Sequence, residues 1–423
     1  MTTTSFSRLG TANTYGSALR NISARQAELS ALQENVTSGK RVVRASDDPT
    51  SAGIAERALT RMSRIATDQR ALASQVGAIK QAESTLGDVT DALKRFRNLA
   101  VSAGDGTYSS AQRKTIAQEM QGLRDHIFTL ANSKNSNGLP LFNALGSALQ
   151  PFVGPEATSP DYQFNGLPGT SASTTNTIPF ALDGDSAFML APTQDASYNV
   201  SLGSGSSNTT LKASVVSITD ATLLTGSSYS ISNITTAAVV PATSPATNQA
   251  TYDLIETLAG TNTPLPAVST VGPVFPGTST NIALSVPGMT LTLTGTVMAG
   301  DTVNIKPNVS LFSVLDNAIK GIGEASSNNT AAQAISQALH NIDISSQRVS
   351  AVRGQAGELL NRADRITGSQ EKLSVQMEAD RSRAEDLDMI KGLSDVQNKE
   401  SGLQVALQTY AKVQKISLFD YIS

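Results

Sequence analysis

The sequence predicts a multidomain protein of α and β structure, in which both chain ends form an elongated antiparallel helical coiled-coil bundle and an all-β domain is inserted between them. Three observations predict this fold. Apolar residues recur at heptad spacing in residues 1–150 and again in residues 309–423. Residues 151–308 instead form a tract rich in Thr, Ser, Gly and Pro. Aromatic residues make up only 4% of the chain, which suits seams filled by aliphatic side chains.

The first expected helix carries a weak apolar track that ends before Gly39. Gln26 and Gln33 occupy seam positions, so this helix is marginal on its own. The segment Ser46-Asp47-Asp48-Pro49 then places acidic residues and Pro where a new helix opens. The apolar track of the first helix consists of Tyr15, Leu19, Ile22, Leu29 and Val36.

The second expected helix has the clearest periodicity in the chain. Its seven-residue repeat predicts a left-handed supercoil against a partner helix. The helix ends at Gly104-Asp105-Gly106, and Ser109 with Gln112 predicts a capping box for a third helix. The repeat consists of Ala58, Ile65, Leu72, Ile79, Leu86, Leu93 and Ala100.

The C-terminal part repeats this pattern with two companion rows that form an a/d seam of about six heptads. One row is Ile335, Ile342, Val349, Ala356, Ala363, Gln370 and Met377, and the other is Ala338, Ser345, Val352, Leu359, Ile366 and Leu373. A terminal helix follows, whose track is interrupted by Glu400 and Gln414. That track consists of Met389, Leu393, Val396, Leu403, Leu407 and Tyr410.

The middle tract alternates short β-branched runs with Gly, Pro and Asn. Two examples are Met289–Thr294 and Thr302–Lys306. Residues 151–300 contain eight acidic residues and one basic residue, Lys212. An all-β domain is favoured over partial disorder because Val and Ile recur often enough to form a core.

Five segments follow from these patterns. Residues 1–45 and 385–423 are expected to form a terminal coiled-coil domain, residues 46–150 and 309–384 a helical rod domain, and residues 151–308 the inserted β-rich domain. The terminal tracks, with their polar interruptions, are expected to bury against neighbouring subunits. This predicted assembly seam comprises Tyr15, Leu19, Ile22, Leu29, Val36, Leu393, Val396, Leu403, Leu407 and Tyr410.

The residues that usually carry chemistry are sparse. Cysteine is absent, which excludes disulfides, thiolate metal sites and Cys nucleophiles. His126 and His340 are expected on helix surfaces, and no spacing predicts a zinc site. Asp47-Asp48 fits helix capping better than metal binding, and Asp183-Gly184-Asp185 is expected to be a turn rather than a calcium loop. We therefore expect no catalytic, cofactor or metal site.

Charge and hydropathy limit the partners and the route of export. The net charge is −3, and the basic cluster Lys40, Arg41 and Arg44 lacks stacking aromatics, so nucleic acid is not an expected partner. Ser38-Gly39-Lys40 lacks the upstream glycine of a phosphate loop. No apolar run approaches the roughly 18 residues of a membrane helix, and the N-terminus lacks the apolar core of a cleaved signal.

Both arms resemble the flagellin superfamily. The N-terminal likeness lies in Ser38–Val42, Ser46–Pro49, Leu99–Ser109 and Asn137-Gly138. The segment Gly138–Phe142 carries Pro140 where the superfamily often has an aromatic. Two further segments are similar to the hook–filament junction branch of the superfamily: Gly300–Ile305 with Ser310–Phe312, and the C-terminal Leu407–Ile422. The likeness does not cover residues 151–295.

The resemblance implies a structural protein of the bacterial flagellum that joins hook to filament and performs no catalysis. It implies an extracellular location, reached by type III export without a cleaved signal, and self-assembly into a ring. It also implies contacts with the first hook-associated protein and flagellin, and with a cytosolic export chaperone at the C-terminal segment. Three alternatives stay open: a filament subunit, a hydrolase or sugar-binding module in residues 151–308, and a host-interaction role for the β domain.

Overall fold

The computed structural model describes residues 5–155, 161–203, 211–238, 247–258, 261–273, 280–298 and 300–422. Within these ranges, side chains are not described at 5–15, 236–238, 247–249, 261–262, 266–273, 280 and 413–422. The chain divides into two compact units. Unit 1 consists of Met1–Arg70 with Ile366–Ser423, and unit 2 consists of Ala71–Arg365.

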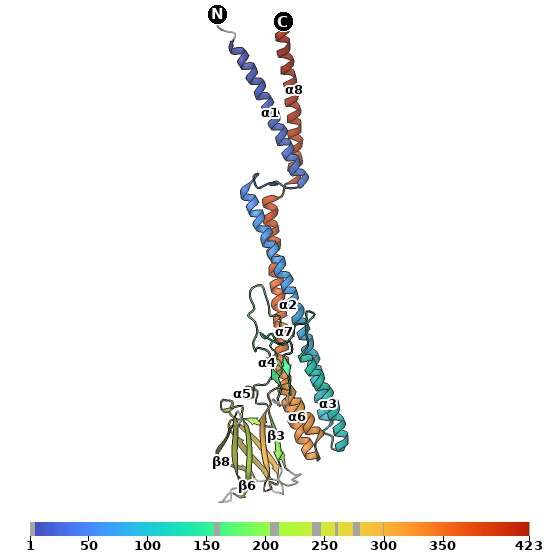
Figure 1. Cartoon of the computed structure of the whole chain (residues 1–423), viewed down its shortest axis with the longest axis vertical. Coiled ribbons are helices and arrows are strands. Elements are labelled where there is room, and N and C mark those ends of the chain that lie inside the picture. The colour runs from blue at the N-terminus through green and yellow to red at the C-terminus, as the bar shows by residue number, and fades with distance from the viewer. Residues whose placement is uncertain are drawn as a thin grey trace. The chain divides into compact units, whose positions relative to one another are not determined.

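Long helices occupy both ends of the chain, and the strands lie between them (Figure 1). The N-terminal helices are α1 (Ser5–Ser38), α2 (Pro49–Ser102) and α3 (Ser110–Ala131), and the C-terminal helices are α6 (Leu311–Gly323), α7 (Asn328–Glu385) and α8 (Met389–Ile422). The short elements between them are α4 (Gly184–Phe188), α5 (Pro192–Asp195) and the 3-10 helix η1 (Ala221–Leu223). The expected fold class is confirmed.

The helix ends lie where the capping residues predict them. Helix α1 ends one residue before Gly39, whose φ of 69° is the left-handed conformation that terminates helices. The Asp48 carboxylate accepts a hydrogen bond from the Ser51 amide at the start of α2 (3.1 Å). Ser109 and Gln112 form the expected capping box of α3.

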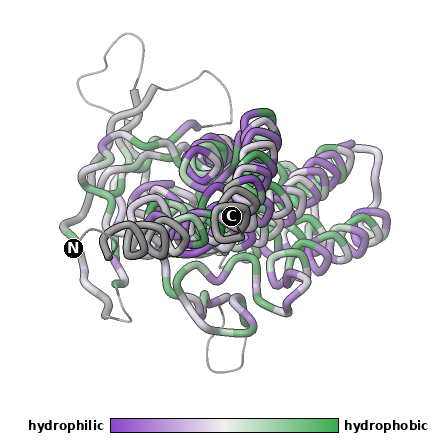
Figure 2. The backbone as a smooth tube through the Cα atoms, turned by 90° about the horizontal axis from the view of Figure 1, so that it is seen from above, coloured by the Kyte–Doolittle hydropathy of each residue, from purple (hydrophilic) through white to green (hydrophobic). Residues whose placement is uncertain are grey.

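The heptad rows are buried, as their spacing predicts. In unit 2, Leu72, Ile79, Leu86 and Leu93 of α2 are each at most 2% exposed. On α7, Ile335, Ile342, Val349, Ala356 and Ala363 are buried in the same way. The two helices run antiparallel here, since Glu83 pairs with Arg353 and Arg97 pairs with Asp343. In Figure 2, the helices alternate between hydrophobic green and hydrophilic purple, as amphipathic helices do.

In unit 1, the same heptad rows continue, but fewer of their residues are buried. Ala58, Met62 and Ile65 of α2 pack with Met377 of α7. Leu373, which the periodicity places in the companion row, is instead 45% exposed. Ile366 of the same row is 7% exposed, so the companion row is buried at the start of unit 1 and uncovered one heptad further on.

The strands of the middle tract form two principal antiparallel sheets in unit 2, together with a short hairpin of β1 (Phe152–Val153) and β2 (Gln163–Phe164). One sheet has the order β3-β11-β6-β7-β8, and the other has the order β4-β10-β5 with β9 also paired to β10. The strands are β3 (Tyr198–Gly203), β4 (Lys212–Ala213), β5 (Ser217–Ile218), β6 (Ser228–Ala238), β7 (Thr247–Leu258), β8 (Thr261–Pro273), β9 (Thr280–Val286), β10 (Met289–Gly295) and β11 (Thr302–Pro307). The expectation of an inserted β domain is thus confirmed, with the short helices α4, α5 and η1 between its strands.

Both sheets contribute to one hydrophobic core. Tyr229, Ile231, Val303 and Ile305 from the first sheet are at most 1% exposed, as are Leu284, Met289 and Leu293 from the second. The alternation in β10 is strict, because Met289, Leu291 and Leu293 face inward while the threonines between them face outward. This core contains the Val and Ile residues whose recurrence favoured a folded β domain over partial disorder.

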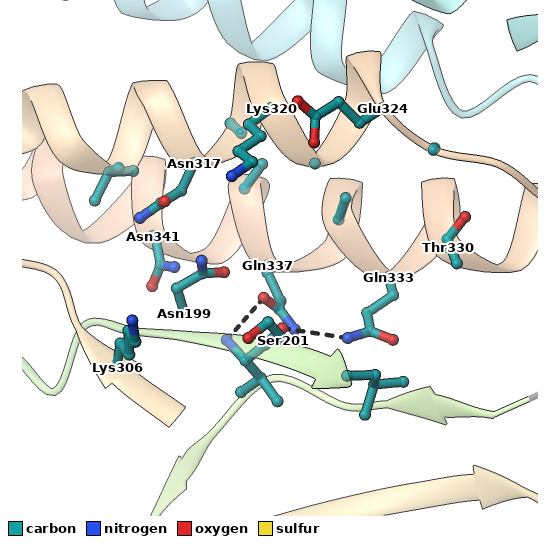
Figure 3. A pocket seen from close by; sticks show the side chains of 18 of the residues that line it. Asn199, Ser201, Lys306, Asn317, Lys320, Glu324, Thr330, Gln333, Gln337 and Asn341 are labelled. Carbon is teal, nitrogen blue, oxygen red and sulfur yellow. Dashed lines mark hydrogen bonds between the residues drawn. The ribbon is translucent and has the colours of Figure 1, made fainter. Parts of the chain in front are cut away.

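A ladder of amide side chains on α7 covers the edge strand β3. Gln337 accepts the Val200 amide (3.0 Å), Gln333 donates to the Val200 carbonyl (3.3 Å), and Asn341 donates to the Tyr198 carbonyl (3.0 Å). These amides lie four residues apart on the helix and therefore share one face. They satisfy three backbone groups of β3, namely the Val200 amide and carbonyl (Figure 3) and the Tyr198 carbonyl.

Aromatic side chains pack where α3, α6 and the segment around β1 meet. The Phe312 ring on α6 lies 5.1 Å from Phe128, 5.6 Å from Phe152 and 5.9 Å from Phe188. Phe142 is fully buried beside Phe188, and Pro140 forms a bridge with Lys134. Pro140 is therefore accommodated within the turn that follows α3.

One local expectation differs from the structure. Asp183-Gly184-Asp185 begins the short helix α4 and is not an isolated turn, because the Asp183 side chain accepts the Asp185 amide as an N-cap. Among the described residues, no helix combines the length and apolar character needed to cross a membrane.

Candidate assembly interface

Helices α1 and α8 form an antiparallel pair in unit 1. Four contacts mark a constant register: Gly39 with Leu387, Val36 with Gly392, Glu28 with Lys399, and Arg25 with Gly402. A Cβ atom added at Gly392 would lie 2.8 Å from Leu387 and 3.3 Å from Val36, so the missing side chain permits close approach. Toward the chain ends the two helices move apart (Figure 1).

The predicted seam residues lie along this pair, but the pairing leaves much of the seam uncovered. Leu19, Leu393 and Leu407 are 45%, 52% and 46% exposed. The partly covered residues are Ile22, Leu29, Val36, Val396, Leu403 and Tyr410. Tyr15 lies in α1, and its side chain is outside the described residues. The role of these ten residues in assembly stays a prediction.

The described side chains of α1 and α8 include no buried apolar residue. Val405 and Ile390 of α8 are also 62% and 84% exposed. An amphipathic helix in water is stabilised mainly by burying its apolar face. This pair therefore buries too little apolar surface to account for two 34-residue helices.

A cluster of charged residues joins the two chain segments where α1 ends and α8 begins. We name Lys40, Arg41, Arg381 and Glu385 the terminal clamp. Lys40 forms an ion pair with Glu385, and Arg41 donates its backbone amide to the Glu385 carbonyl (2.7 Å) and its guanidinium to the Ala384 carbonyl (2.8 Å). Arg381 pairs with Glu385 at 3.0 Å. The clamp thus holds the ends of α1 and α7 together in unit 1.

The electrostatics of the clamp favour its charged form. The hydrogen bond from Lys40, together with that from Arg381, lowers the pKa of the Glu385 carboxyl below its ordinary value of 4.5. Hydrogen bonds to Glu378 and Glu385 raise the pKa of the Arg381 guanidinium. Hydrogen bonds from Ser51 lower the pKa of the nearby capping residue Asp48 to about 2.

The residues weighed for chemistry lie apart from one another. His126 and His340 are exposed on helix surfaces, as expected. Among the described residues, no group of three His, Cys, Asp or Glu side chains could hold a metal ion. Lys40, Arg41 and Arg44 lie in the predicted turn, and Arg44 pairs with Glu34 at 2.7 Å.

Comparison with known proteins identifies the N-terminal part of the chain. Residues 10–146 match the model of the bacterial flagellin N-terminal helical region. The chain has a flagellin-type N-terminal region. This match covers α2, α3 and most of α1, so the flagellin-type region supplies one helix of the terminal pair and one side of the buried seam.

Curated relatives resemble the chain over about a third of its length. The chain is 35% identical over 147 residues to flagellar hook-associated protein 3 of Salmonella typhimurium, which covers 34% of this chain and 46% of that protein. It is 32% identical over 126 residues to the flagellar filament 41 kDa core protein of Borreliella burgdorferi, covering 30% of this chain and 38% of that one. The chain therefore spans less than half the length of these curated relatives.

Solved structures extend the likeness to the fold of most of the chain. The crystal structure of flagellar hook-associated protein 3 from Legionella pneumophila superposes with a TM-score of 0.57 at 24% identity, covering 77% of this chain and 97% of that one. FlgL of Xanthomonas campestris superposes with a TM-score of 0.56 at 22% identity, covering 78% and 99%. At this identity the likeness shows a shared fold: helices from both chain ends with an inserted β domain.

The sequence patterns missed the terminal clamp. Lys40 and Glu385 are 345 residues apart, so no local spacing could pair them. The only available signal was compositional, since a basic cluster follows α1 and an acidic cluster with Arg381 closes α7. Gly392 and Gly402 were missed as well, because a glycine at a helix contact is recognisable only once the partner helix is known.

Proposed function

We propose that this protein is a structural component of the bacterial flagellum that joins hook to filament by assembly of its terminal helices. The observation that carries the proposal is the α1–α8 pair, whose described side chains bury no apolar residue. Isolated helices with such exposed tracks gain stability by packing against further helices. A second copy of the chain, together with hook-side and filament-side flagellar proteins, provides those helices.

The partners and location follow from the same proposal. The protein assembles as a ring on the first hook-associated protein and below flagellin, outside the cell, and reaches that place by export without a cleaved signal. A cytosolic chaperone covers the C-terminal segment, residues 385–423, before export. The 35% identity to flagellar hook-associated protein 3 over 147 residues supports this assignment. Its mechanism is the burial of the assembly seam, and it needs no catalytic group.

A filament subunit is the second candidate. The chain matches the N-terminal helical region of flagellins, and it is 32% identical over 126 residues to a flagellar filament core protein. Deletion of the gene separates the two. A junction protein leaves hooks without filaments and flagellin released into the medium. Filaments that persist in the deletion strain would contradict the junction role and favour an accessory subunit.

Complementation of the deletion strain then tests the seam. The full chain restores swimming, whereas a chain lacking residues 385–423 does not. Leu393→Asp places a charge on the exposed apolar track and is expected to abolish filament assembly while leaving the monomer folded. Gln397→Asp, on an exposed position of the same helix, is the matched control and should still support swimming. Equal swimming of the two variants would exclude the seam as an assembly surface.

A further inference from the structure

Three arginines form a row along α2 in unit 1. Arg57, Arg61 and Arg64 lie four and three residues apart, so they share one side of the helix. All three are exposed, and within the described part of the chain none of them forms an ion pair. We name them the arginine row. Each stands one residue before a position that packs with Met377 of α7, and those positions are Ala58, Met62 and Ile65.

Three glutamates lie beside the same helix contact, each one residue after a buried position. Their side chains are exposed. Glu56 and Glu371 form no ion pair among the described residues, whereas Glu378 pairs with Arg381. The glutamate row consists of Glu56, Glu371 and Glu378, which follow the buried Ala55, Gln370 and Met377.

The two rows lie on opposite flanks of the α2–α7 pair. The helices are antiparallel in unit 1, because the Arg41 guanidinium donates to both Ser51 and the Ala384 carbonyl, while Ala58 packs with Met377 one step further along. Each residue turns an α-helix by about 100°. In an antiparallel pair, residues that precede the buried positions therefore share one flank on both helices, and residues that follow them share the opposite flank.

The charged residues next to buried positions follow one rule throughout residues 54–66 and 369–385. Those directly before a buried position are basic, and those directly after one are acidic. The rule ends at Gln69, which has Asp68 before it and Arg70 after it. Opposite charges of one chain thus lie on opposite flanks, where they do not neutralise each other.

Each flank also exposes one large apolar side chain of α2. Ile54 precedes the buried Ala55 on the arginine flank and is 39% exposed. Leu59 follows the buried Ala58 on the glutamate flank and is 44% exposed. Exposed ion pairs are weak one at a time, so burial of these apolar side chains against a partner would add to the stability of a contact.

We propose that the arginine row of one copy of this chain docks on the glutamate row of the next copy. The inference rests on the proposed function, because it assigns a contact surface to the assembly of copies. Both rows lie beside Met377, so parallel copies placed side by side bring opposite charges together. A symmetric pair joined through one flank would place like charges face to face, which is unfavourable. The contact is head-to-tail, and repeated contacts of this kind close into a ring or continue as a helix.

Reversal of each row tests the contact by complementation of the deletion strain. Arg61→Glu/Arg64→Glu reverses the arginine row, and Glu56→Arg/Glu371→Arg reverses the glutamate row. Each double variant is expected to lose filaments and swimming, because like charges then meet at every contact. The quadruple variant exchanges the charges and is expected to regain both. Since the rows lie on opposite flanks of one copy, this rescue requires contact between copies.

Arg70→Glu makes the same charge change on α2 outside the arginine row, and this matched control should swim. Circular dichroism of the purified variants confirms that they are folded. Swimming of both double variants, or a quadruple variant as defective as either double variant, would refute the docking. If the unaltered chain does not restore swimming, the proposed flagellar function fails instead.

Cross-linking identifies the flanks that meet. The chain contains no cysteine, so Arg57→Cys/Glu371→Cys carries two thiols, one on each flank. Treatment of isolated flagella with a short bismaleimide linker is expected to join copies into chains longer than two. Either single variant can join at most two copies and is the control. Monomers alone from flagella that contain the double variant would overturn the head-to-tail contact.

Discussion

The helix pairs α2–α7 and α1–α8 both carry apolar residues at heptad spacing, but these residues are buried in the first pair and largely exposed in the second. Along α2 and α7, residues at heptad spacing are buried, and Leu86 and Val349 have no exposed surface. Along α1 and α8, apolar residues at the same spacing remain half exposed, as Leu393 and Leu407 are. Both pairs are antiparallel, and both have cross-helix ion pairs. Heptad spacing therefore predicts that a face is apolar, but it does not predict whether the same chain covers that face.

The difference in burial between the two helix pairs follows from the residues at their heptad positions. The α2 and α7 rows use Leu, Ile, Val and Ala almost throughout, and β-domain segments add further cover, since Gln75 of α2 accepts the Ile178 amide (3.2 Å). The terminal tracks are interrupted by Gln26, Gln33 and Glu400. A track with polar interruptions packs weakly against one partner, and it gains more from several partners that cover different sides.

The largest expected effect comes from the buried row. Leu86→Ala removes a fully buried side chain and leaves a cavity, so the free energy of unfolding should decrease by about 2–5 kcal/mol. Chemical denaturation followed by circular dichroism measures it. A decrease below about 1 kcal/mol would mean that the α2–α7 contact is not the main core of the helical region.

The terminal clamp should have an intermediate effect. Arg381→Met removes ion pairs to Glu378, Glu385 and Asp386 from a side chain that is 19% exposed, and we expect a loss of about 1–2 kcal/mol in unit 1. Arg383→Met is the control, because Arg383 is 75% exposed and has one ion pair. Hydrogen exchange of the Arg41 amide reports on the clamp directly. Equal exchange in the two variants would show that Arg381 does not hold it.

Acid should release the clamp in a defined direction. The pKa of Glu385 is lower in the folded chain than its ordinary value of 4.5, so its stabilising contribution is complete above that value and is lost as pH falls through the folded pKa. Exchange of the Arg41 amide is therefore expected to quicken, beyond its intrinsic pH dependence, only below about pH 4.5. Glu385→Gln should remove this extra acid dependence. An identical pH profile in the variant would assign the effect to other carboxylates.

The smallest effect on the isolated chain is expected on the terminal track. Leu407→Ala changes a side chain that is 46% exposed, so the free energy of unfolding should change by less than about 0.5 kcal/mol. Assembly of copies, measured by sedimentation, should decrease all the same. A loss of stability comparable to that of Leu86→Ala would mean that the lone chain already buries the terminal track, and the contrast between the two pairs would fail.

Local signals predicted much of the fold. Gly39, Asp48 and the Ser109–Gln112 capping box mark helix ends because each acts on backbone groups within a few residues. The buried α2 row follows from spacing alone, and β10 and β11 follow from β-branched alternation. Each of these features depends only on residues within the same helix or strand, so the sequence alone is sufficient to predict it.

Contacts between distant segments could not be predicted in this way. The strand order β3-β11-β6-β7-β8 depends on how residues 198–203 meet residues 302–307, and nothing local encodes that pairing. The amides Gln333, Gln337 and Asn341 look like ordinary polar positions on a helix surface until β3 is placed beside them.

The amide ladder has a consequence for how copies of this chain can be crowded together. An open edge strand is a template onto which another molecule can add a strand, and such additions have no natural limit. At Tyr198 and Val200 that template is already occupied by helix α7. Copies can therefore be brought to high local concentration without growing a shared sheet from the β3 edge.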